Sequence, residues 1–178
     1  MSDLHARIDG HLRWFLAHAQ ARGYGGDDCA LWSSSLDLAS GRHPASTERP
    51  PGIGKRCYRF IESPWGANLY WDQPLLVACR AWAARCGEAG PAEAVTACVR
   101  DFLARCVSPS GLFWWGNHYY WDLRLGRVVA FVDERRAPEP VAADDPAPYH
   151  ECRPQPVAWD LLAGVDRERA LAAARALR

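Results

Sequence analysis

Two apolar stripes separated by a short turn constrain the fold of this chain most. Residues 70–88 and 91–107 each carry apolar side chains at helical spacing. They are Leu75, Cys79, Trp82 and Cys86 in the first segment, and Val95, Cys98, Phe102 and Cys106 in the second. Gly87 and Gly90 end the first helix, and Pro91 opens the next. Because about four residues join them, the two helices are predicted to run antiparallel as one αα-hairpin.

Weaker signals predict the remaining elements. An amphipathic helix is expected over 1–22, and a long Gly-, Pro- and Ser-rich loop region over 25–68. Two strands, Tyr119–Leu123 and Arg127–Val132, are expected to form a short β-hairpin near 119–132. A further helix pair fills 156–178, with Asp166 capping its second member. The last helix reaches Arg178 without a stop signal, so we expect the 178 residues to be one incomplete domain, 1–178, of something longer.

The charge balance and the cysteines exclude several classes of protein. Lys and Arg number 21 and so do Asp and Glu, so no net field favours a nucleic acid or an anionic membrane. Neither a secretory signal nor an apolar run of membrane-spanning length is visible in the sequence. The seven cysteines are an odd number without a C-x-x-C pair, which predicts buried free thiols. We therefore expect a cytoplasmic protein.

Three stretches combine aromatic and polar side chains: "WGANLYWDQP" (65–74), "LFWWGNHYYWD" (112–122) and "YHECRPQP" (149–156). Each lies ahead of a helix or a hairpin, so stacked helical hairpins would open all three at one end of the molecule. That arrangement would gather nine residues at one mouth: Trp71, Asp72, Trp114, Trp115, Asn117, His118, His150, Glu151 and Arg153.

Simpler interpretations compete with a functional one at each position. Any single tryptophan is more often a core residue than a stacking platform, and Asp72, followed by Pro74, is more often a helix N-cap. His118 fits a histidine bonded to a backbone carbonyl as well as it fits a ligand or proton carrier. Arg153 is more often a solvated charge, but beside a histidine and a glutamate it can pair with a substrate carboxylate. Two imidazoles and a carboxylate, from His118, His150 and Glu151, could bind a divalent ion such as manganese or calcium.

At "SPWGANLYWDQPLLVA", "VRDFLARCVSPSGLFWWGNHYYWD" and "HECRPQPVAWDLL" the chain resembles the α/α-toroid (six-hairpin) carbohydrate-active proteins, most closely those that are pectate-lyase-like. The resemblance covers roughly residues 25–178. It implies a mainly α fold, a partial (α/α) toroid of antiparallel helical hairpins, with a groove where the loops gather. It also implies a metal site, for which His118, His150 and Glu151 are the candidates, and an arginine base, for which Arg153 is the candidate.

We therefore predict a polysaccharide lyase that cleaves uronate-containing chains by β-elimination. Arg153 and His118 are its expected catalytic residues, and the expected substrate-binding residues are Trp71, Asp72, Trp114, Trp115, Asn117 and Tyr120. A glycoside hydrolase, with Asp72 and Asp122 as its two carboxylates, is one alternative. A non-catalytic, degenerate glycan-binding fragment is another. Half a ring would expose apolar helix faces, so a free-standing chain is expected to be unstable, to form a homodimer or to aggregate.

Overall fold

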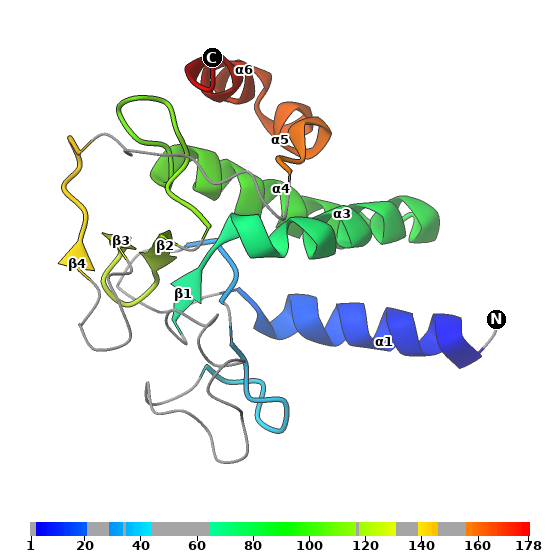
Figure 1. Cartoon of the computed structure of the whole chain (residues 1–178). Coiled ribbons are helices and arrows are strands. Elements are labelled where there is room, and N and C mark those ends of the chain that lie inside the picture. Colours follow the sequence, from blue (N-terminus) through cyan, green and yellow to red (C-terminus); the bar gives the residue numbers. More distant parts are fainter. Residues whose placement is uncertain are drawn as a thin grey trace.

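A long helical hairpin forms the centre of the molecule in the computed structural model (Figure 1). The structure describes residues 3–20, 29–33, 35–43, 65–116, 118–130, 139–145 and 156–178. Its helices are α1 (Asp3–His18), α3 (Leu69–Cys86), α4 (Ala89–Arg105), α5 (Trp159–Val165) and α6 (Arg167–Ala176). Its strands are β1 (Gly66–Ala67), β2 (Tyr119–Asp122), β3 (Arg127–Ala130) and β4 (Glu139–Pro140). Helix α1 lies on one side of the α3–α4 hairpin and α5 and α6 lie on the other, with the strands near the start of α3 (Figure 1).

The predicted αα-hairpin is confirmed, with two differences. Gly87 has a left-handed backbone (φ 68°) and donates its N–H to the Ala83 carbonyl, which ends α3 as a glycine cap does. The second predicted stripe, on α4, is buried throughout. In the first stripe Cys86, in the last turn of α3, is exposed. Asp72 is not the N-cap, since α3 begins three residues earlier and Asn68 occupies that position.

The four strands form one antiparallel sheet in the order β1-β2-β3-β4. The predicted β-hairpin is confirmed, with Tyr119 opposite Ala130 and Asp122 opposite Arg127. Strand β1 comes from the end of the segment predicted to be a loop, and it pairs with β2 through Gly66 opposite Asp122. This pairing joins residues more than fifty positions apart, so no local pattern in the sequence predicts it.

The expectation of a partial (α/α) toroid is wrong. The described residues hold one long helical hairpin, a single helix α1, a short α5–α6 pair and a four-stranded antiparallel sheet, which makes the fold mixed α and β. The aromatic stretch around residues 112–122 feeds the sheet as strand β2, instead of serving as a loop between stacked hairpins. The homodimer was expected from the exposed faces of a half ring, and it stays a prediction.

An aromatic cluster joins the α3–α4 hairpin to the loop that precedes β2. The Phe113 ring lies 5.0 Å from that of Trp115 and 5.2 Å from that of Phe102, centroid to centroid, and both pairs meet edge to face. Tyr70, at the start of α3, meets the Trp115 ring in the same way at 5.3 Å. Such pairs add about 0.5–1.5 kcal/mol each beyond the area they bury.

Among the described helices, none has both the length and the apolar character needed to cross a membrane.

Candidate functional site

The first turn of α3 is the place where segments from distant parts of the chain meet. Strand β1 leads directly into this turn and pairs with β2, which follows the second aromatic stretch. The Leu123 N–H also donates to the Trp65 carbonyl at 2.9 Å, which extends the contact by one residue. The first two aromatic–polar stretches therefore lie side by side, although helix α4 separates them in the sequence.

Asn68 fastens the second stretch to this turn. Its side-chain amide donates to the carbonyls of Gly116 (2.6 Å) and Tyr119 (3.2 Å), and its side-chain oxygen accepts from the Gly116 N–H (3.1 Å). Gly116 has a positive φ of 81°, a conformation that glycine adopts without strain. An asparagine at an N-cap usually bonds to its own helix, but this side chain makes no such bond and holds the loop that carries His118.

Gln73 binds the segment that follows the third stretch to the same turn. Its side-chain oxygen accepts from the Ala158 N–H at 2.6 Å, and its amide donates to the Tyr70 carbonyl at 3.4 Å. The side chain is buried. Most of the third stretch, 149–155, lies outside the described residues, but the chain that follows it is thus anchored one residue from Asp72.

Asp72 is the titratable group at this meeting point. Although part of the residue stays exposed, its surroundings withdraw the carboxyl group from water, and this burial raises its pKa from 3.8 to about 7. A hydrogen bond with the Asn68 backbone acts in the opposite direction but is the weaker effect. A carboxyl group with a pKa near neutrality can both accept and release a proton under physiological conditions.

The Cys98 thiol lies near this carboxyl group, and Trp71 precedes it along α3. Burial raises the pKa of the Cys98 thiol well above 9.0, and the nearby Asp72 charge adds to the effect, so Cys98 is an uncharged neighbour. Trp71, next to Asp72 in the sequence, meets the Tyr70 ring edge to face at 4.8 Å. Trp71 itself is only partly buried. The site thus combines a carboxyl group of raised pKa with a partly buried tryptophan.

The predicted site residues fall into three groups. Trp71, Asp72 and His118 lie at or near the α3 turn and are partly exposed. Trp114, Trp115 and Tyr120 are buried in the core, where their ring faces pack against protein and offer no stacking platform to a sugar. The remaining four lie outside the described residues: Asn117, His150, Glu151 and Arg153.

The metal hypothesis rests on residues of which only one is described. His118 is partly exposed in the loop between Gly116 and β2, whereas its two expected partners lie outside the described residues. Within the parts of the chain that the structure describes, no three His, Cys, Asp or Glu side chains group closely enough to hold a metal ion. The His118, His150 and Glu151 site stays a prediction.

Sequence reasoning missed Asn68 and Gln73. Both are buried amides inside an aromatic stretch, where a polar side chain needs a partner. That signal identifies them as hydrogen-bonding residues but does not name the partner, because the bonds span 48 and 85 residues.

Comparison with protein-family models and with curated protein sequences finds no match to this chain.

Proposed function

We propose that the protein is a carbohydrate-active enzyme, a polysaccharide lyase on uronate-containing chains, and that Asp72 exchanges the proton in its reaction. The observation that carries the proposal is the pKa of about 7 of this carboxyl group, at the turn where the first two aromatic–polar stretches meet. Trp71, the preceding residue of α3, is partly exposed and carries an indole, a group that stacks on sugar rings. The substrate class rests on the sequence resemblance to pectate-lyase-like proteins alone, since the fold is not the toroid which that resemblance implied.

The chemistry of β-elimination suits such a group. A base removes the proton from C5 of a uronate, the electrons of that bond form the C4–C5 double bond, and the C4–O bond breaks. The departing oxygen needs a proton in return. Asp72, about half ionised at neutral pH, can take the first proton and deliver the second. Asp72 is thereby a second candidate for the base, as an alternative to Arg153. The role of Arg153 stays a prediction, because this residue lies outside the described residues.

Asp122, one of the two carboxylates that a glycoside hydrolase would need, has a structural role instead. Asp122 is buried, and its Oδ1 accepts the N–H groups of Arg124 (2.9 Å) and Leu125 (3.0 Å). These bonds shape the β2–β3 turn and commit the carboxylate to structure. Asp72 therefore has no free partner in Asp122 with which to flank a glycosidic bond.

Incubation with polygalacturonate and alginate tests the proposal through the ultraviolet absorbance of unsaturated uronates. We expect absorbance to develop with the wild-type chain, and kcat/KM to rise with pH through about 7, because the base acts when ionised. Asp72→Asn should lower kcat at least about 100-fold, whereas Asp145→Asn, at an exposed position after β4, should not change it. An Asp72→Asn variant of full activity would exclude Asp72 as the proton carrier.

Other outcomes overturn the reaction class. New reducing ends without the absorbance would identify a hydrolase. Binding of the polysaccharide with neither product would identify a binding protein, and no response to either polysaccharide would remove the uronate hypothesis.

We also propose a reducing compartment, the cytoplasm. The five described cysteines carry free thiols, and four of them are buried. Free thiols persist where the redox poise keeps them reduced. Fractionation of cells that express a tagged full-length protein tests this proposal, and recovery with secreted proteins would contradict it.

A further inference from the structure

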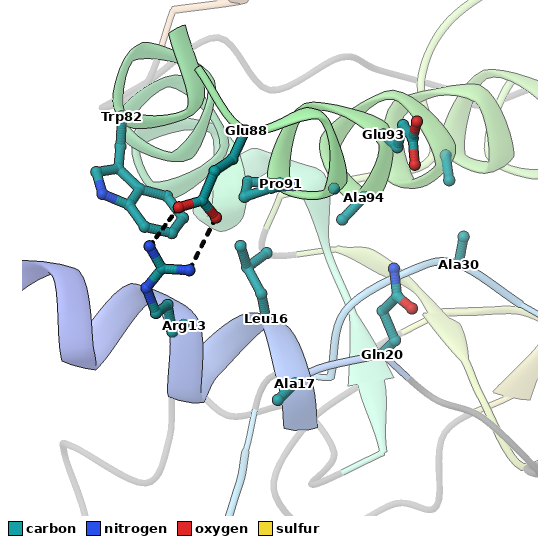
Figure 2. A pocket seen from close by; sticks show the side chains of 12 residues that line it. Arg13, Leu16, Ala17, Gln20, Ala30, Trp82, Glu88, Pro91, Glu93 and Ala94 are labelled. Carbon is teal, nitrogen blue, oxygen red and sulfur yellow. Dashed lines mark hydrogen bonds and ion pairs between the residues drawn. The ribbon is translucent and has the colours of Figure 1, made fainter. Parts of the chain in front are cut away.

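A groove of about 670 Å³ separates α1 from the start of α4 and lies apart from the Asp72 site (Figure 2). Its apolar walls are formed by Leu16 and Ala17 of α1 and by Pro91, Ala94 and Ala97 of α4. Figure 2 shows Leu16 opposite Pro91 and Ala94 across this space. The volume lies within the range of small-molecule sites, about 300–1,000 Å³.

The groove exists because α1 is fastened to the rest of the molecule at two places and faces small side chains between them. Near its middle, Arg13 of α1 bonds to Glu88, and Asp9 accepts the Trp82 indole N–H at 3.0 Å. Beyond its end, the Ala19 carbonyl accepts the Ser33 N–H at 3.1 Å. Between these attachments, Gly90, Ala94 and Ala97 of α4 are too small to fill the space.

Carboxylates outnumber cations around the groove. Arg13 is the one basic residue among its lining residues, and it is already engaged by two acids. Its hydrogen bonds hold the pKa of Asp9 and of Glu88 below their usual values, so both are ionised at neutral pH. Glu93 adds a further carboxylate on the α4 side. Among the described residues that line the groove, two carboxylates, Glu88 and Glu93, therefore accompany one guanidinium that is already ion-paired, so a second cation would be favoured near Glu93.

We propose that this groove binds a small organic cation with an apolar body, of the alkylamine class. The apolar body would lie against Leu16 and Ala94, where its burial is worth about 0.8 kcal/mol per CH₂ group. The ammonium group would lie towards Glu93 and the side-chain amide of Gln20, both of which line the groove. An anion of the same length meets the excess of carboxylates and is disfavoured, which makes the proposal specific in charge as well as in shape.

Titration of the full chain with hexylamine, followed by amide chemical shifts and calorimetry, tests the proposal, with hexanol and hexanoate as probes of equal length. Saturable binding of hexylamine is expected, with the largest shifts in α1 and in the first half of α4. Hexanol should bind at least threefold more weakly, since an exposed ion pair is worth up to about 1 kcal/mol. Hexanoate should show no saturable binding.

Two variants and a control make the test specific. Glu93→Gln should weaken hexylamine binding about three- to fivefold, whereas Glu168→Gln, an exposed acid on α6, should leave it unchanged. Ala94→Leu should narrow the groove where the apolar body lies and weaken binding, with an unchanged circular dichroism spectrum as the check on folding. Equal binding of hexylamine and hexanol, an unaffected Glu93→Gln variant or shifts confined to other elements would overturn the proposal.

Discussion

At the scale of the residue, Asp72 couples the candidate site to the stability of the fold. Its pKa is about 7 in the folded state and near 3.8 in the unfolded chain, so the folded state binds the proton more tightly. Between these values, rising pH removes the proton from the unfolded state first and thereby lowers the free energy of unfolding. The loss amounts to at most about 1.4 kcal/mol per pH unit and is complete above pH 7.

The Asp72→Asn variant tests this coupling, because an amide cannot ionise. We expect the variant and the wild type to unfold with similar free energies near pH 4, and the variant to be more stable by about 1–4 kcal/mol at pH 8. Urea unfolding at several pH values measures the difference. Asp144→Asn, at an exposed position in the loop after β4, serves as the control and should show no such trend. A difference that stays constant from pH 4 to pH 8 would contradict the raised pKa.

At the scale of the element, the cap of α6 is the clearest local device. The Asp166 side chain accepts the Arg169 N–H at 3.0 Å and begins the helix, as predicted. Asp166→Ala should lower the free energy of unfolding by about 1 kcal/mol. Asp166→Asn, which keeps an acceptor, should lower it by much less. Thermal and urea unfolding compare the two variants, and an equal loss in both would show that the cap bond is not the cause.

At the scale of the whole molecule, the order in which the cysteine thiols react with a reagent shows which parts of the fold become exposed to solvent. Cys98 and Cys106 are buried in α4 and its cap, and burial raises the pKa of both thiols, so neither forms a reactive thiolate in the native state. Cys86 is exposed at the end of α3. Brief treatment of the native protein with iodoacetamide should therefore modify Cys86 well before the other two. Peptide mass mapping measures the order, and early modification of Cys98 would show that α4 opens without global unfolding.

The candidate site could be predicted only in part. The sequence identified Asp72 as a member of the site, but its spacing favoured a cap, and its raised pKa depends on groups that surround it in space. Asn68 and Gln73 were not identified, because their partners lie 48 and 85 residues away. Trp115 was expected at a ligand surface and lies in the core, since aromatic composition alone does not tell a stacking platform from packing.

The sequence by itself determined the local elements: the α3–α4 hairpin, the β2–β3 hairpin and the capped start of α6. Periodicity, turn glycines and caps act over a few residues and can be read from a single segment. The tertiary structure alone decided that β1 pairs with β2, that the helices do not form a toroid, and that a groove lies between α1 and α4. These features depend on which buried surfaces meet, and apolar burial is non-directional, so the stripes that predicted each helix did not specify its neighbour.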